Sequence, residues 1–406
     1  MALKERRYFM IKRTKYLEEI RPFYNEDLIK VITGIRRCGK STLLKQIIEE
    51  INKNVDNNHI IYINFEDVEY ADIRDFKDLN DFIKNKIEDE KKYYLFFDEI
   101  QKVDKWEKVV NSFKATLNVS IFITGSNSDL LSGELATYLS GRYVSFKMQP
   151  FTFKEICEFK KATRQDYDDI LKDYLMWGGM PQRFNFIDER QIRTYLSDLY
   201  DSIVMKDIIS RFKINDVDLF NRLIEYIMTT PSQTFSAESL VKYLKENDDR
   251  NVSKDTIYNY LEYMGKAFLI NKVDRYDVRG KRILNGKYKY YLTDLGIGQM
   301  LNVSKREQLG AYLENIVYNE LIYRGYDVKV GTLDKGEIDF IALKDGQKIY
   351  VQVAYILADD TVIDREFGVY DNIQDNYPKY VISMDKFDFS QNGIIHKNII
   401  DFLLEK

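Results

Sequence analysis

Strand-like apolar runs alternate with helical patterns between residues 28 and 151. The first run, LIKVIT at 28–33, is followed closely by STLLKQIIEEI, which has the apolar spacing of a helix. Four more strand-like runs come after it: HIIYINFED (59–67), YYLFFDE (93–99), VSIFITG (119–125) and RYVSFKMQPF (142–151). This alternation predicts an α/β fold, a parallel sheet with helices on both faces.

The rest of the chain is richer in helical patterns. Residues 152–176 are predicted to be helical, and the paired glycines and the proline of WGGMP (177–181) predict a domain boundary where they interrupt the pattern. Residues 188–212 have the amphipathic pattern of a packing helix. Two helical patterns and then two strand-like runs occupy 236–294, and a helix followed by further strand-like runs occupies 310–355.

Length and composition favour a folded protein of several domains. The chain has 406 residues, 45% hydrophobic and 31% charged, and its apolar runs fall far short of the roughly 20 residues that span a bilayer. We therefore expect no membrane partner. Two cysteines and two histidines exclude a disulfide framework and a Cys/His zinc site, so we expect a protein of the reducing cytoplasm. The net charge of −4 leaves room only for a local basic patch.

The segment between the first strand and its helix has the composition of a phosphate-binding loop. GIRRCGKS, Gly34–Ser41, matches the pattern G-x-x-x-x-G-K-[ST] between a strand and a helix. Its glycines let backbone N–H groups turn toward phosphate oxygens, and the helix N-terminus adds donors. The residues predicted to bind ATP here are Gly34, Arg36, Arg37, Cys38, Gly39, Lys40, Ser41 and Thr42. Lys40 would neutralise the β and γ phosphates and Ser41 would ligate Mg²⁺; the alternative is a plain glycine turn.

Two acids end the strand-like run at 93–99, where the second half of such a site is expected. Asp98 is predicted to hold Mg²⁺ through water, and Glu99 to orient and deprotonate the attacking water. The alternative is a buried strand with acids at its solvent end.

Two further candidates stand near the last two strand-like runs. Ser126 or Asn127 resembles a sensor of the γ-phosphate, although Asn127 or Ser128 could instead cap a helix. Arg142, at the start of the last run, is a candidate arginine finger that acts within the chain or on a neighbouring copy in a homo-oligomer. An ordinary surface salt bridge is the alternative for Arg142.

Cys38 is an unusual residue for the middle of this loop. It follows two arginines and precedes a helix N-terminus, a setting that favours the thiolate. We therefore expect thiol reagents to inactivate the site, the alternative being that Cys38 is a small residue the loop tolerates.

Four segments together resemble a large family of prokaryotic AAA-type ATPases that carry a C-terminal domain of unknown function. The segments are ITGIRRCGKSTLL, FFDEIQKVDKWEKVV, FITGSNSDLLSGELATYLSGR and YLMWGGMPQ. The resemblance runs in order over nearly the whole chain and implies ATP and Mg²⁺ as ligands. The strand-like run at 59–67 lies between the loop and the two acids. Together with Glu99 beside Asp98, this inserted run resembles the arrangement in the AAA and STAND branch of P-loop ATPases.

Residues 236–294 resemble a winged-helix module, with two helices and a two-stranded wing. Between 271 and 290 seven basic residues stand against two acids, with tyrosines interleaved. The DNA-binding candidates are Lys254 and Asn259 on the second helix, with Arg275, Arg279, Lys281 and Arg282 in the wing. The alternative is a packing module with a solvated basic hairpin.

Residues 310–355 are similar to the core of PD-(D/E)xK nucleases. That resemblance implies a divalent cation bound by Asp339 and by an acid at position 352, with Glu314 on the preceding helix. Gln352 replaces the acid and Ala354 replaces the lysine, so we predict a degenerate nuclease fold kept for binding or assembly. A cap or a buried polar pair is the alternative for Glu314 and Asp339.

Together these patterns predict an AAA-like P-loop NTPase fold, followed by an α-rich winged-helix region and a small α/β nuclease-like domain. The predicted segments are a helical lead-in (1–27), the ATPase core (28–156), a helical lid and linker (157–234), the winged helix (235–300) and the nuclease-like domain (305–406). The first hypothesis for function is an ATP-hydrolysing switch or motor whose C-terminal half binds DNA. The alternatives are a nucleotide-gated signalling or assembly protein whose C-terminal half binds protein, and an ATP-dependent endonuclease, which Gln352 and Ala354 disfavour.

Overall fold

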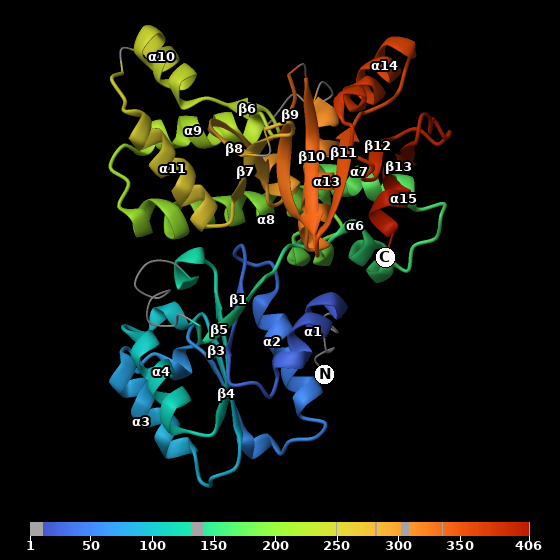
Figure 1. Ribbon diagram of the computed structural model, residues 1–406. Coiled ribbons are helices and arrows are strands. Elements are labelled where there is room, and N and C mark those ends of the chain that lie inside the picture. The colour runs from blue at the N-terminus through green and yellow to red at the C-terminus, as the bar shows by residue number, and fades with distance from the viewer. Residues whose placement is uncertain are drawn as a thin grey trace. The chain divides into compact units, whose positions relative to one another are not determined.

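The computed structural model describes residues 11–131, 141–248, 250–280, 282–301, 308–334 and 336–405. These residues form two compact units. One consists of the chain up to Gln149 with Lys266–Phe268, and the other of Pro150–Gly265 with the chain from Leu269 onward. Figure 1 shows both units, each built around its own sheet.

The first unit is a parallel sheet with strand order β2-β3-β4-β1-β5. Its strands are β1 (Ile29–Thr33), β2 (Ile60–Asn64), β3 (Tyr93–Asp98), β4 (Val119–Gly125) and β5 (Tyr143–Lys147), and its helices are α1 (Thr14–Ile20), α2 (Lys40–Ile51), α3 (Phe76–Lys86) and α4 (Trp106–Thr116). Helices α1 and α2 lie on one side of the sheet and α3 and α4 on the other (Figure 1). Every residue of β1, β3 and β4 is buried, as expected for strands covered on both faces, and the predicted α/β fold is confirmed.

Local sequence explains where helix α3 begins and which face it buries. The Asp75 side chain accepts hydrogen bonds from the backbone N–H groups of Lys77 and Asp78, and Asp78 completes a capping box. Leu79 and Ile83, one turn apart, then pack into the apolar core beneath the sheet.

The second unit contains an eight-stranded sheet with strand order β13-β12-β11-β10-β9-β7-β8-β6 among its described residues. The strands are β6 (Thr234–Phe235), β7 (Ile270–Asp277), β8 (Arg282–Leu292), β9 (Asp327–Thr332), β10 (Glu337–Lys344), β11 (Gln347–Val353), β12 (Lys379–Ser383) and β13 (Ile394–Asn398).

The helices of the second unit include all those predicted after residue 150. They are α6 (Phe153–Lys160), α7 (Tyr167–Trp177), α8 (Glu189–Ser202), α9 (Val217–Thr229), α10 (Ala237–Asp248), α11 (Lys254–Lys266), α12 (Leu295–Gly298), α13 (Leu309–Tyr323), α14 (Asp360–Gly368) and α15 (Ile399–Leu404). Helices α9, α10 and α11 lie toward the β8 end of the sheet, and α14 and α15 toward the β12 end (Figure 1). Within the described ranges no helix is both long enough and apolar enough to cross a bilayer.

One sheet crosses the boundary that the sequence places between residues 300 and 305. Strand β7 pairs in parallel with β9, with Arg275 opposite Val330 and Asp277 opposite Thr332. The β7–β8 hairpin is therefore part of the larger sheet and not a separate wing. The prediction of two separate domains is wrong here, because pairing between distant strands leaves no mark in local periodicity.

The glycines of WGGMP are packed inside the second unit. Asp294 accepts a hydrogen bond from the Gly179 N–H at 2.7 Å, and a Cβ on Gly178 would lie 2.1 Å from Asp294 Oδ1. A Cβ on Gly179 would lie 2.1 Å from the carbonyl oxygen of Phe151. The predicted boundary at 177–181 is therefore wrong, because these glycines permit close approach and the chain divides at Gln149 instead.

We expect Gly178→Ala to destabilise the protein by roughly 2–4 kcal/mol, because the residue has a φ of 68° and its new Cβ would collide with Asp294. Gly346→Ala is the matched control, since Gly346 has a φ of 76° but no described atom would lie within 4 Å of its new Cβ. Urea denaturation followed by fluorescence measures both changes. An equal loss in the two variants would show that the contact with Asp294 has no effect on stability.

Candidate nucleotide site

The loop between β1 and α2 depends on backbone conformations that favour glycine. Gly34 has a φ of 151° and Gly39 a φ of 107°, and Arg37 is also left-handed at 67°. A Cβ on Gly34 would lie 2.3 Å from the carbonyl oxygen of Met148, so the position also requires the absence of a side chain. Helix α2 begins directly after Gly39, so its unpaired N–H groups are at the loop.

The side chains of the loop differ in exposure. Arg37 and Ser41 are exposed, Thr42 is half-buried, and Arg36 lies 3.8 Å from the Glu66 carboxylate. Ser41 and Thr42 lie in the first turn of α2, where a bound phosphate would meet the helix N-terminus.

Lys40 brings a buried positive charge to the loop. Its side chain is 4% exposed, and its ammonium donates hydrogen bonds to the carbonyl oxygens of Gly34 at 3.1 Å and Ile35 at 3.3 Å. The same ammonium lies 3.7 Å from the Glu99 carboxylate. Positive charge is therefore concentrated next to the N–H groups that begin α2, which favours an anion such as phosphate.

Hydroxyl groups from both neighbouring strands hold Asp98, the last residue of β3. Tyr62 on β2 donates to Asp98 Oδ2 at 3.1 Å, and Thr124 on β4 donates to Oδ1. Burial, together with the Asp98 charge, raises the pKa of Tyr62 above its usual value, so this hydroxyl stays protonated and remains a donor. The buried Asp98 carboxylate is thereby fixed in orientation.

Glu99 leaves the strand in a left-handed conformation with a φ of 56°. Its backbone N–H donates to Thr124 Oγ1 at 2.9 Å, and its carboxylate accepts a hydrogen bond from Gln101 Nε2. The Thr124 hydroxyl therefore joins the backbone of Glu99 to the carboxylate of Asp98. One side chain on β4 positions both acids.

Sequence reasoning missed Tyr62, Gln101 and Thr124. A register count could have found Thr124, because Phe97 lies opposite Ile123 and the next residues along the two parallel strands are Asp98 and Thr124. No local pattern marks Gln101, whose contact depends on the turn that Glu99 makes.

The predicted sensor residues lie at the same edge of the sheet. Ser126 and Asn127 follow β4 directly, and their side chains are 4% and 1% exposed. A short 3-10 helix begins at Ser128. Their role toward a γ-phosphate stays a prediction.

Arg142 lies near the amino ends of the strands, whereas the loop lies at their carboxyl ends. It precedes β5, which runs parallel to β1 with Tyr143 opposite Ile29 and Lys147 opposite Thr33. The loop follows Thr33, so the length of a five-residue strand, about 15 Å, separates it from Arg142. The prediction that Arg142 reaches the nucleotide of its own chain is wrong, and a role toward a neighbouring copy stays a prediction.

Cys38 is fully buried in the loop. Burial raises the pKa of its thiol even though Lys40 and Arg13 lower it. The prediction of a reactive thiolate is therefore wrong, because desolvation outweighs the attraction of the nearby cations. Cys38 acts as a small apolar residue, with its sulfur 3.0 Å from where a Gly34 Cβ would lie.

The polar groups at this edge fit a magnesium ion by their chemistry. Mg²⁺ takes oxygen ligands, usually one or two from protein together with phosphate oxygens and water. The Ser41 hydroxyl and the fixed Asp98 carboxylate are such groups. These two residues would hold the ion in a nucleotide complex.

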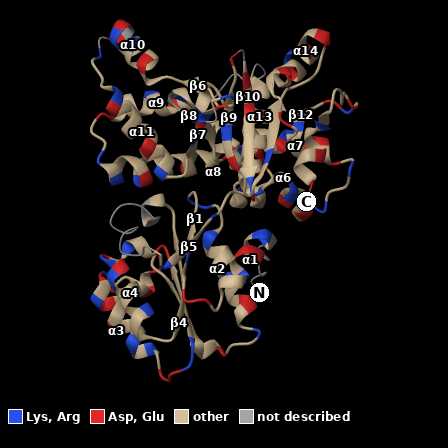
Figure 2. Cartoon of the chain, viewed as in Figure 1, with Lys and Arg blue, Asp and Glu red and all other residues tan. Residues whose placement is uncertain are grey.

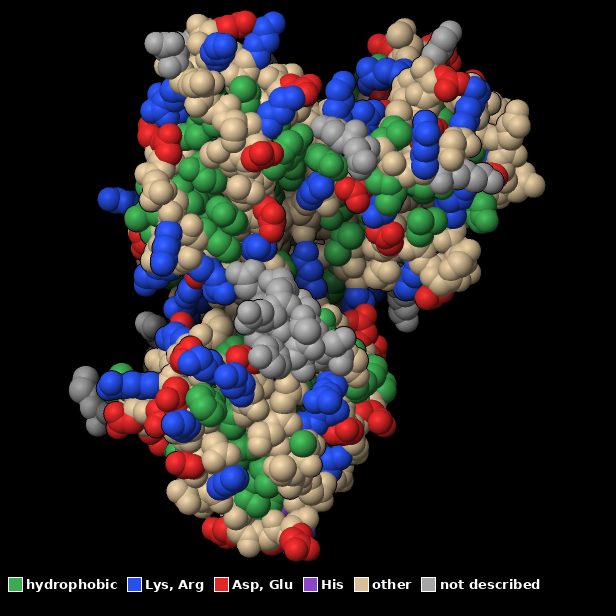
Figure 3. Space-filling view, turned by 60° about the vertical axis from the view of Figure 1, so that its left-hand side comes forward, with side chains coloured by type: hydrophobic (Ala, Val, Ile, Leu, Met, Phe, Trp, Pro, Cys, Tyr) green, Lys and Arg blue, Asp and Glu red, His purple; other side chains and the backbone are tan. Residues whose placement is uncertain are grey.

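Carboxylates contact most of the cations predicted to bind DNA. Lys254 contacts Glu238, Arg275 contacts Glu337 at 3.3 Å, Arg279 contacts Asp334, and Arg282 contacts Asp277 at 3.6 Å. Asn259 is exposed, and Lys281 lies outside the described residues. Figure 2 shows basic and acidic residues interspersed along this unit, and Figure 3 shows the same mixture on the surface of its helical part. The positive excess counted along residues 271–290 is therefore reduced by acids from distant segments.

The nuclease-like residues come together in the second unit. The Asp339 N–H donates to Gln352 Oε1 at 3.2 Å, and the ammonium of Lys289 lies 3.1 Å from Glu314 and 3.7 Å from Asp339. Sequence reasoning counted Lys289 only as part of the basic patch and missed Glu337, which also contacts it. As arranged in the described parts of the chain, no group of three or more carboxylate, imidazole or thiolate side chains is suited to hold a metal ion.

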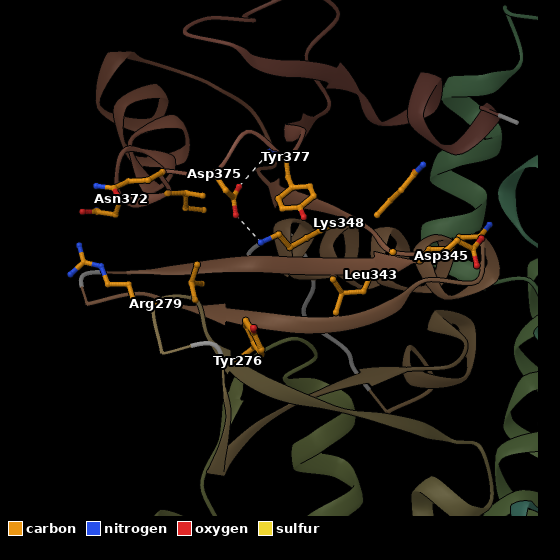
Figure 4. A pocket seen from close by; sticks show the side chains of 14 residues that line it. Tyr276, Arg279, Leu343, Asp345, Lys348, Asn372, Asp375 and Tyr377 are labelled. Atoms are coloured by element: carbon orange, nitrogen blue, oxygen red, sulfur yellow. Dashed lines mark hydrogen bonds and ion pairs between the residues drawn. The ribbon is translucent and has the colours of Figure 1, made fainter.

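An open cavity of about 1070 Å³ lies elsewhere in the second unit, lined by the end of β7, the β10–β11 hairpin and residues 372–377. In Figure 4 Lys348 points across this cavity to Asp375, and the two groups are 2.7 Å apart. Tyr350 also donates to Asp375 at 2.7 Å. The Lys348 charge is thus neutralised locally by Asp375, whereas the Lys40 ammonium has carbonyl oxygens as its hydrogen-bond partners.

Comparison with known proteins agrees with the geometry of the first unit. Residues 26–157 match the family model of an AAA domain, and residues 168–308 match a domain of unknown function, DUF8612. The Walker-type ATPase PABY2304 of Pyrococcus abyssi has a similar fold, with a TM-score of 0.51 and 16% identity over 75% of this chain and 99% of that chain. The loop, the strand order and the two acids therefore define an AAA-type P-loop ATPase fold.

Two relatives match this chain over most of its length. An uncharacterized protein of Haemophilus influenzae is 38% identical over 401 residues, which cover 98% of this chain and 99% of the relative. Uncharacterized protein MJ1544 of Methanocaldococcus jannaschii is 33% identical over 356 residues, which cover 84% of this chain and 78% of the relative. This chain belongs to the same protein family as these two relatives.

We expect Thr124→Val to lower ATP turnover roughly 10- to 100-fold while ATP binding is kept, because valine has a similar shape but cannot connect Asp98 to the Glu99 backbone. Thr116→Val is the control, since among the described residues the Thr116 hydroxyl bonds only to the Ser112 carbonyl at the exposed end of α4. Steady-state phosphate release and nucleotide titration measure the two quantities. Unchanged turnover in Thr124→Val would show that the link does not position the acids.

Proposed function

We propose that this protein binds ATP with Mg²⁺ and hydrolyses the nucleotide, and that the ATPase cycle controls a C-terminal half that engages DNA. The observation that carries the first part is the convergence of a buried ammonium and two acids at one edge of the sheet. Lys40 lies 3.7 Å from Glu99, and Asp98 and Glu99 both contact Thr124.

Each group has a role that follows from its chemistry. The loop N–H groups and Lys40 would bind the phosphates, and Ser41 and Asp98 would hold Mg²⁺, which would offset the phosphate charge. Glu99 is the general base that orients and deprotonates the attacking water. Its contacts with Lys40 and Gln101 keep the carboxylate near the loop.

The DNA part of the proposal is supported by the cations that are exposed on the β7–β8 hairpin. Lys272, Arg279 and Arg282 have side chains 49%, 58% and 74% exposed. Their ion pairs lie in water and contribute little, so a phosphate group can replace the carboxylate at small cost. Lys289 is buried and Arg275 half-buried, each in an ion pair, which leaves fewer phosphate contacts than the sequence predicts.

Glu99→Gln is expected to keep ATP binding and to lower turnover at least 100-fold, because the amide cannot accept a proton from water. Lys40→Ala is expected to lose ATP binding itself. Glu66→Gln is the control, since Glu66 is an exposed carboxylate that contacts Arg36 and Lys102. Phosphate release and titration with a fluorescent ATP analogue test the assignments, and normal turnover in Glu99→Gln would remove Glu99 as the base.

The double variant Arg279→Ala/Arg282→Ala is expected to weaken DNA binding and to lower the slope of log affinity against log salt by about two, one for each lost phosphate contact. Lys172→Ala/Lys386→Ala is the control, because it removes two exposed, paired cations from the same unit. Fluorescence anisotropy with labelled duplex and single-stranded DNA measures binding. If the wild type binds no DNA at low salt, the DNA part of the proposal is refuted and a protein partner is favoured. That result would not affect the proposal of ATP hydrolysis, which the Glu99 and Lys40 variants test.

A further inference from the structure

Lys289 on β8 is a buried lysine surrounded by carboxylates. Its side chain is 7% exposed, and its ammonium lies 2.7 Å from Glu337, 3.1 Å from Glu314 and 3.7 Å from Asp339. These acids belong to α13 and β10, so the contacts join elements that are distant in sequence. A lysine this deeply buried keeps its charge only where such partners offset its loss of water.

Each of the three carboxylates is also held by a second partner. Tyr291 donates to Glu314 at 2.6 Å, and Arg275 lies 3.3 Å from Glu337. The backbone N–H of Val353 donates to Asp339 Oδ2 at 2.9 Å. The acids are therefore oriented toward a common point, and the ammonium of Lys289 is at that point.

The Gln352 side chain makes a different set of contacts, with a backbone N–H of the cluster and with a further acid. Gln352 Oε1 accepts a hydrogen bond from the Asp339 N–H, and Gln352 Nε2 donates to Glu366 at 2.8 Å. Arg365 in turn contacts Glu366 at 2.6 Å. Both polar atoms of the Gln352 side chain thus have partners other than the Glu314, Glu337 and Asp339 carboxylates.

We propose that Lys289 is a tethered cation that fills the cation position of the Glu314–Glu337–Asp339 cluster, so that the cluster holds an ammonium group in place of a divalent ion. The ammonium and a divalent ion are mutually exclusive there, because both require the same carboxylate oxygens. The contact also fastens the β7–β8 hairpin to α13 and β10. This proposal does not depend on ATP hydrolysis.

Manganese binding to the full-length, nucleotide-free protein tests the proposal. The wild type is titrated with MnCl₂ and free Mn²⁺ is followed by electron paramagnetic resonance, with Asp339→Asn beside it to isolate the cluster. We expect no difference between these two proteins. A wild-type Mn²⁺ site that Asp339→Asn removes would overturn the proposal, because metal and Lys289 would then coexist.

Removal of the ammonium in Lys289→Met lets the three carboxylates move closer together around an ion. This variant is expected to gain an Mn²⁺ site at least 10-fold tighter than any in the wild type, and Lys289→Met/Asp339→Asn is expected to lose it again. Lys272→Met is the matched control, since its side chain is 49% exposed and its nearest acid is 3.8 Å away. We expect that control to bind Mn²⁺ as the wild type does. A folded Lys289→Met protein with no new site would overturn the proposal.

Thermal unfolding covers the case in which the uncompensated acids unfold the Lys289→Met variant. Its melting temperature is expected to be several degrees below that of the wild type and to recover when MnCl₂ is added during refolding. The variant that also carries Asp339→Asn is expected to show no recovery with MnCl₂. If MnCl₂ does not raise the melting temperature of Lys289→Met, the proposal is overturned, as it is if the folded variant binds no Mn²⁺.

Discussion

The parallel register of β1, β3 and β4 is the constraint on which the nucleotide site depends. These strands are buried over their whole length, so their ends are fixed by the packing of both faces. The register brings Thr124 beside Asp98 and places the loop after Thr33 at the same edge. A shift of one residue in β4 would put the Thr124 side chain on the other face and separate both acids from it.

Each unit contains a buried lysine beside carboxylates, and the two differ in how firmly the charge is held. Lys40 has backbone carbonyl oxygens as its hydrogen-bond partners and one carboxylate at 3.7 Å. Lys289 has three carboxylates, of which the closest is 2.7 Å away. A phosphate can attract Lys40 away from weak partners, whereas moving Lys289 would leave buried acids without compensation. The first arrangement suits a ligand site and the second a permanent structural contact.

The sequence predicted what is local and missed what depends on distant partners. The loop pattern and the acids after an apolar run selected Lys40, Asp98 and Glu99, which lie together in the structure, and the alternating patterns predicted the parallel sheet. Arg142 was assigned to the wrong edge even though it precedes its strand, so strand direction alone could have corrected it. The burial of Cys38 and the partners of Lys289 could not be predicted, because desolvation and long-range ion pairs follow from the packing of the whole unit.

The continuous sheet of the second unit limits how the proposed cycle can act. The β7–β8 hairpin is paired with β9 through Arg275, Tyr276 and Asp277, and Lys289 fastens β8 to α13 and β10. Moving the hairpin alone would break its hydrogen bonds to β9 and would also leave buried charges without partners. Each lost hydrogen bond and each unpaired charge would cost about 1 kcal/mol or more. A nucleotide-driven change that reaches the exposed cations of the hairpin must therefore move the hairpin together with β9 and β10. A partner of this hairpin would then be engaged by the whole sheet and not by an independent wing.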